Sequence, residues 1–74
     1  MEYTIKATIH HGDYYAELVE TGKTTADALR KMGEKNSYIA HTEYQLGYVL
    51  GQLDTNPEGT AQMGWVNYES VEGA

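Results

Sequence analysis

The sequence predicts one small α+β domain over residues 1–74, with a three-stranded antiparallel sheet and two helices on one face, in the order β-β-α-α-β. Three observations lead to this prediction. Residues 2–9 alternate between polar and apolar side chains, which is typical of a strand with one buried face. Residues 39–53 instead repeat their apolar side chains with the period of a helix. With 74 residues and no cysteine, the chain can bury only one small core and has no disulfide to reinforce it.

The first 21 residues predict an antiparallel hairpin. The apolar face of the first strand consists of Tyr3, Ile5, Ala7 and Ile9. Residues 10–13 form the turn, because Gly12 adopts positive φ without steric cost. Residues 14–21, rich in Tyr and Val, then return as the second strand.

Residues 25–34 predict a short helix that packs on this hairpin. Thr24 or Thr25 can cap its first turn, since a Thr hydroxyl accepts a hydrogen bond from an unpaired backbone N–H. Gly33 or Asn36 can end it.

Residues 37–55 fit two structures. In a helix, the apolar side chains of Ile39, Leu46, Val49, Leu50 and Leu53 would lie within an arc of about 100°. Residues 42–45 (Thr-Glu-Tyr-Gln) also fit the capping-box pattern. In a strand, alternate residues from 44 to 50 would share a face, and two glycines in this segment disfavour a helix by about 1 kcal/mol each. We predict the helix, because a one-sided strand would separate two adjacent apolar residues; a strand over 43–53, in the order β-β-α-β-β, is the alternative.

The last predicted element is a strand over residues 62–71. Residues 54–59 precede it and form a turn or loop, since Pro57 and Gly59 interrupt regular structure. Trp65, Val66 and Tyr68 supply the aromatic and β-branched side chains typical of a strand. We expect this strand to pair with the hairpin.

No motif indicates an enzyme, a cofactor or a metal site. Residues 22–24 (Gly-Lys-Thr) match the end of a phosphate-binding loop, but position 17 is Glu where the motif needs Gly. The candidate metal ligands are His10, His11, Asp13 and His41. Neighbouring strand residues point to opposite faces, so the two adjacent histidines are poorly placed to share an ion. We therefore expect a protein without catalytic activity.

The charge and the hydrophobicity of the chain limit the kinds of molecule that the protein is expected to bind. The net charge of −6 argues against direct nucleic-acid binding, which needs a basic surface. No apolar run approaches the roughly 20 residues that cross a bilayer, and the first ten residues do not resemble a signal peptide. The sequence thus predicts a cytoplasmic protein that contacts neither nucleic acid nor membrane.

Acidic residues are segregated along the chain. Residues 1–35 contain six acids and all five bases, whereas residues 36–74 contain five acids and no Lys or Arg. An excess of acid in one half would steer that half toward a basic partner by long-range attraction. We predict a larger protein with a basic surface as the partner.

The aromatic residues support an interaction surface. Seven Tyr and one Trp occur without any Phe, and Tyr and Trp are enriched at protein interfaces because their polar ends remain hydrogen-bonded. On the predicted second helix, two tyrosines and two glycines lie opposite the apolar stripe, which also allows a homodimer. The residues predicted to bind a partner are Glu43, Tyr44, Tyr48, Asp54, Glu58, Tyr68 and Glu69.

Two families resemble the sequence in different ways. In size, acidity and lack of catalytic motifs, the chain resembles small phage-encoded inhibitors of host defence, such as anti-CRISPR and anti-restriction proteins. This resemblance implies a non-enzymatic inhibitor that occludes a basic site, in the cytoplasm of a bacterial host. Residues 14–32 (YYAELVETGKTTADALRKM) resemble the strand, turn and helix start of HicB-like antitoxins, which implies a small regulatory domain. A homo-oligomeric structural protein is the third possibility.

Overall fold

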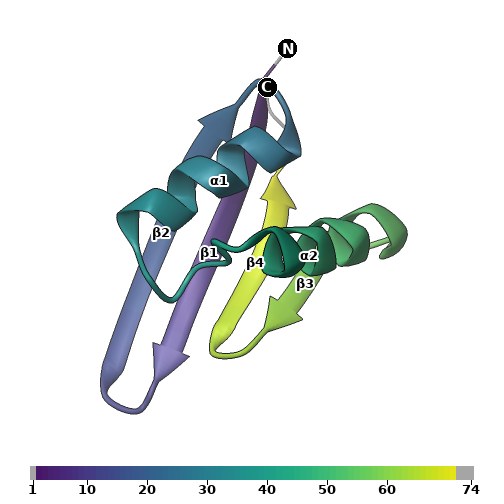
Figure 1. Ribbon diagram of the computed structural model, residues 1–74. Coiled ribbons are helices and arrows are strands. Elements are labelled where there is room, and N and C mark those ends of the chain that lie inside the picture. Colours follow the sequence, from purple (N-terminus) through teal and green to yellow (C-terminus); the bar gives the residue numbers. More distant parts are fainter. Residues whose placement is uncertain (1, 72–74) are drawn as a thin grey trace.

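In the computed structural model, which describes residues 2–71, two β-hairpins precede and follow a pair of helices along the chain. The elements are β1 (Tyr3–His11), β2 (Tyr14–Gly22), α1 (Thr25–Lys35), α2 (Glu43–Thr55), β3 (Thr60–Met63) and β4 (Val66–Val71). The strands form one antiparallel sheet in the order β2-β1-β4-β3, and both helices cover the same face (Figure 1). The α+β class is confirmed. Neither helix has the length and apolar character needed to cross a membrane.

The prediction of three strands is wrong, because a second tight turn divides the segment expected to be one strand. Gly64 has a φ of 60°, and the chain reverses so that Met63 pairs with Val66. Gly12 has a φ of 61° at the corresponding position of the first hairpin. A glycine with positive φ in the first place of a two-residue turn fits the type II′ geometry that suits hairpins. Residues 60–71 therefore form β3 and β4, and the strand alternative for residues 43–53 is also wrong.

Both helices begin where a threonine caps them. The Thr24 hydroxyl accepts a hydrogen bond from the Asp27 backbone N–H at 3.0 Å. Thr42 and Gln45 form the predicted capping box at the start of α2. Each cap satisfies backbone donors that the first helical turn leaves unpaired. Ile39, which we predicted within the second helix, instead lies in the loop before it, although its side chain is still buried.

The core lies between the sheet and the helices. From α2, the side chains of Leu46, Val49 and Leu53 enter it, while Leu50 is only partly buried at its edge. The fully buried large side chains are Ile5, Ile9, Leu29, Met32, Ile39, Val49, Val66 and Tyr68. They come from both helices, both central strands and the α1–α2 loop, so this single cluster holds all the layers together.

The β3 edge of the sheet is covered by the side chains of Gln52 in α2 and of Asn56, the residue that caps its C-terminal end. The Gln52 amide accepts a hydrogen bond from the Gln62 backbone N–H and donates one to the Gln62 carbonyl, both at 3.2 Å. The Asn56 amide donates to the Thr60 carbonyl at 3.1 Å. Bound backbone groups cannot pair with a strand from another chain. A partner is therefore more easily bound through side chains than through this edge.

Two helix glycines should respond in opposite ways to alanine. A Cβ at Gly33 in α1 would lie 2.6 Å from the Ala40 carbonyl oxygen, whereas a Cβ at Gly47 in α2 meets nothing within 4 Å. Alanine favours a helix over glycine by about 0.5–1 kcal/mol. We expect Gly47→Ala to raise the free energy of unfolding by that amount, and Gly33→Ala to lower it by about 1–3 kcal/mol through overpacking. Urea denaturation of both variants checks this, and a loss of stability in Gly47→Ala would contradict the exposed position of that residue.

Candidate interaction surface

Tyr68, predicted to bind a partner, is in the core. Its side chain is 1% exposed, and its hydroxyl accepts a hydrogen bond from the Ala40 backbone N–H at 3.0 Å. Burial raises the pKa of the Tyr68 hydroxyl above its ordinary value. The residue attaches the α1–α2 loop to β4, so it has no surface to offer a partner, and the prediction for this position is wrong.

The other six predicted residues are exposed but lie in three separate places. Glu43, Tyr44 and Tyr48 are on the outer side of the first half of α2, where 82% of Tyr44 and 49% of Tyr48 is exposed. Asp54 is in the last turn of α2, and Glu58 follows in the loop. Glu69 is on β4, on the face of the sheet that the helices leave uncovered, opposite Lys6 of β1. One surface cannot contain all six.

The acidic residues of the second half have no ion-pair partners among residues 2–71. All three ion pairs found there join residues of the first half: Lys6–Glu17 at 3.5 Å, Lys31–Asp27 at 3.9 Å and Lys35–Glu20 at 2.5 Å. The hydrogen bond from Lys35 is the main reason that the pKa of Glu20 is lowered. The carboxylates of Glu43, Asp54, Glu58 and Glu69 therefore remain available to a cationic partner.

A row of rings, missed in the sequence analysis, lies at one end of the sheet. The imidazole of His11 stacks on the indole of Trp65, with ring centres 4.3 Å apart and planes 23° apart. The other side of the row is a stack of Tyr14 on Tyr38, with centres 5.2 Å and planes 20° apart. His11 and Tyr38 join the two stacks through an edge contact and a 3.0 Å hydrogen bond between Nδ1 and the hydroxyl. We call His11, Tyr14, Tyr38 and Trp65 the ring row.

Two turns and a loop bring the ring row together. Both hairpin turns point to the lower end of the sheet in Figure 1, and the α1–α2 loop crosses the sheet above them. Tyr38 of this loop contacts His11 at the end of β1. Asn36 fixes that loop, because its amide oxygen accepts from the Tyr38 backbone N–H at 2.9 Å and its NH₂ donates to the Tyr14 hydroxyl at 3.2 Å. A backbone hydrogen bond of 3.0 Å from His10 to the Trp65 carbonyl holds the two turns side by side. These hydrogen bonds fix the segments that carry the rings in place.

Two exposed tyrosines of α2 lie near the second hairpin turn, which also carries one end of the ring row. A shallow hollow of about 340 Å³ is lined by Tyr44 and Tyr48 of α2 together with Gln62, Met63 and Gly64. Gly64 directly precedes Trp65, so this hollow and the ring row meet at the second hairpin turn. The ring row, Tyr44 and Tyr48 together form what we call the aromatic surface. Two acids, Asp13 in the first turn and Glu43 at the start of α2, are its direct neighbours in sequence and have no ion-pair partner among the described residues.

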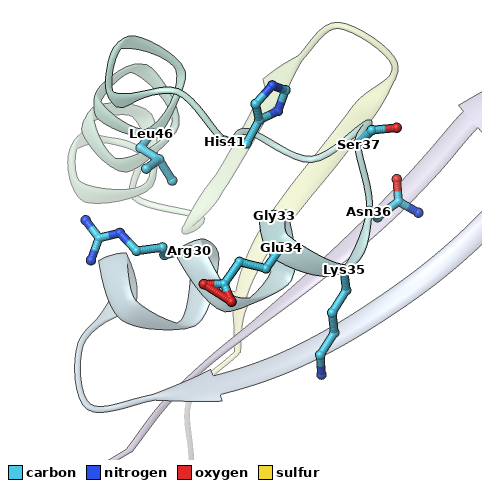
Figure 2. Close-up of a pocket in the computed structure, with 8 residues that line it drawn as sticks. All are labelled: Arg30, Gly33, Glu34, Lys35, Asn36, Ser37, His41 and Leu46. Atoms are coloured by element: carbon cyan, nitrogen blue, oxygen red, sulfur yellow. The ribbon is translucent and has the colours of Figure 1, made fainter.

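A second hollow, of about 430 Å³, lies between α1, the following loop and α2 (Figure 2). Arg30, Glu34 and Leu46 face it, whereas Asn36 and Ser37 point away. His41 makes a 3.0 Å hydrogen bond through Nδ1 to the Ile39 carbonyl, which requires the proton on that nitrogen. The Nδ1 atom of His41 is therefore occupied by a backbone carbonyl.

The residues that resemble catalytic motifs have structural roles. A Cβ at Gly22 would lie 2.6 Å from the Ala28 backbone nitrogen, so glycine allows β2 to approach α1, and Thr24 caps that helix. His10 packs edge-on against Tyr15, while its neighbour His11 stacks on Trp65. Within residues 2–71, no three His, Asp or Glu side chains lie close enough together to hold a metal ion.

Comparisons with known proteins give no further assignment: the chain matches no family model, no curated protein and no solved structure.

Proposed function

We propose that the protein is a non-catalytic binding protein that covers a basic site on a larger partner protein and inhibits it by occlusion. The observation that carries this proposal is the aromatic surface. It groups four contacting rings at the hairpin turns with two exposed tyrosines that line a hollow at the second turn. Asp13 and Glu43, which adjoin these residues in sequence, have no ion-pair partner among residues 2–71.

The exposure of these rings is more than the fold requires. Trp65 is 57% exposed, Tyr14 42% and Tyr44 82%, although a ring that only sealed the core would be largely buried. Tyr and Trp are the residues most enriched at binding hot spots, since they bury a large area and lose little side-chain entropy. An exposed aromatic patch of this kind is typical of a surface that another molecule covers.

Charge supports a basic partner. The net charge is −6, and the carboxylates next to the aromatic surface have no base paired with them in the described part of the chain. Such a surface attracts a basic patch over about 8 Å at physiological ionic strength and repels an acidic one. This proposal retains Glu43, Tyr44 and Tyr48 from the sequence prediction and adds the ring row.

A comparative capture from bacterial lysate tests the proposal. The baits are the wild-type protein, the double variant Glu43→Lys/Tyr44→Ala and the control Glu2→Lys, which has an exposed acid reversed at the start of the chain. We expect wild type and control to retain the same basic protein, and the double variant to bind it at least about 30-fold more weakly, as for a hot-spot residue. Association should also slow as salt is raised, because exposed charges are screened.

Two outcomes would contradict the proposal. One is a captured partner that is acidic or whose association rate is indifferent to salt. The other is an equal loss of affinity in Glu43→Lys/Tyr44→Ala and in Glu2→Lys, since total charge alone would then explain binding.

A further inference from the structure

We infer that the ring row is a binding site for guanidinium groups, so that arginine side chains of the partner are the groups that it recognises. This inference rests on the proposed function and adds the chemical class of the ligand. It is argued from ring geometry, exposure and the position of one carboxylate.

The geometry of the ring row suits planar cations. The planes of the two rings meet at 23° in the Trp65–His11 stack and at 20° in the Tyr14–Tyr38 stack. Within each stack the two rings are therefore nearly parallel. His11 stacks on the indole, yet 57% of Trp65 remains exposed, so a flat group from a partner can still reach this ring. A guanidinium group is flat and stacks on an aromatic face by both cation–π attraction and ring-like packing.

Asp13 supplies the complementary charge. It is exposed in the turn between His11 and Tyr14, the strand residues that contribute two rings of the row. Three other acids of the first half are ion-paired with lysines, but Asp13 has no such partner among residues 2–71. A guanidinium can lie on a ring and bind a carboxylate with two parallel hydrogen bonds, whereas a lysine ammonium is a compact, strongly hydrated point charge.

The same features disfavour the other ligands that stack on aromatic rings. Nucleobases stack well on Tyr and Trp, but their phosphates would meet Asp13 on a chain with a net charge of −6. Neutral sugars also pack on exposed indoles and would not be repelled. Their hydroxyls could donate hydrogen bonds to Asp13, but they carry no positive charge to balance the charge of its carboxylate.

Trp65 makes the test direct, because it is the only tryptophan in the chain and its fluorescence reports on the ring row alone. The probes are an octapeptide of alternating glycine and arginine, the same peptide with lysine in place of arginine, octathymidine and maltose. We expect the arginine peptide to change the emission of Trp65 and to bind about fivefold or more tightly than the lysine peptide. Asp13→Asn and Tyr14→Leu should each weaken the arginine peptide by about fivefold.

A matched control separates binding from folding. Tyr3 and Tyr14 are 41% and 42% exposed, and Tyr3 lies at the opposite end of β1 from the ring row. We expect Tyr3→Leu to leave the affinity for the arginine peptide unchanged. Tyr14→Phe, which keeps the ring and loses only the hydroxyl bonded to Asn36, should retain the preference for arginine. Far-ultraviolet circular dichroism of each variant confirms that it is folded.

The outcomes are distinct from those of the capture experiment. Equal affinity for the arginine and lysine peptides, or a response to maltose or octathymidine without one to arginine, would overturn the guanidinium site. A salt-sensitive basic partner that depends on Glu43 and Tyr44 would then still support the proposed function. Arginine selectivity without any basic partner in the lysate would overturn the proposed function and leave the site established.

Discussion

Val49→Asp is expected to unfold the protein at room temperature. Val49 lies in the middle of α2, has no exposed surface and packs in the core cluster between helix and sheet. The substitution removes a buried apolar side chain and places an unpaired carboxylate where no hydrogen-bond partner is available, at a cost of several kcal/mol. A core of this size supplies roughly 3–5 kcal/mol in total. The folded state should therefore be lost rather than merely weakened.

Val19→Asp is the matched control for this prediction. Val19 is 60% exposed on β2 and lies opposite Lys6 in the sheet, so a carboxylate there remains in water and beside a base. We expect its free energy of unfolding to change by no more than about 0.5–1 kcal/mol. Circular dichroism and urea denaturation compare the two variants. If Val49→Asp retained the wild-type transition, α2 would not pack on the sheet as the structure places it.

Local signals made most of the elements predictable. The alternation in β1 and the threonine caps depend only on residues close in sequence, and the structure confirms both. The division into β3 and β4 was missed because Gly64 is followed by Trp65, a large residue typical of strands, whereas Gly12 is followed by Asp13, a common turn residue. A two-residue turn that begins with glycine was the signal available at both places.

The missed turn also explains the error at Tyr68. Once β4 begins at Val66, its alternation places Val66 and Tyr68 on the covered face of the sheet and Asn67 and Glu69 on the open one. The same register places Val66 opposite Ile9, which brings Trp65 next to the end of β1. The ring row could not be predicted without that pairing, because its members come from three segments that meet only in the folded protein: the first hairpin turn, the α1–α2 loop and the second hairpin turn.

Tyr68→Phe is expected to destabilise the protein by about 1–3 kcal/mol, although the ring and its packing are retained. The hydroxyl of Tyr68 is the acceptor for the Ala40 backbone N–H, in a contact that is fully buried. Removing it leaves this donor without a partner and away from water. Tyr48→Phe is the control, since Tyr48 is 49% exposed and replacing its hydroxyl should leave the free energy of unfolding nearly unchanged. Urea denaturation at neutral pH measures the difference, and equal stabilities of the two variants would contradict the role given to the buried hydroxyl.

The difference in stability between these two variants should narrow in alkali. Burial raises the pKa of Tyr68 above its ordinary value of 10.0, because the phenolate is poorly solvated in the core. Below pH 10 the hydroxyl is protonated in both the folded and the unfolded chain, and its contribution to stability is complete. As the pH rises from that value toward the higher pKa of the folded state, the unfolded chain releases this proton while the native protein retains it, so stability falls.

Wild type and Tyr48→Phe should both show this loss of stability, whereas Tyr68→Phe has no proton to release at this position and should lack that part of the loss. The stability difference between wild type and Tyr68→Phe should therefore shrink above pH 10, and a difference independent of pH would show that Tyr68 does not titrate as a buried phenol.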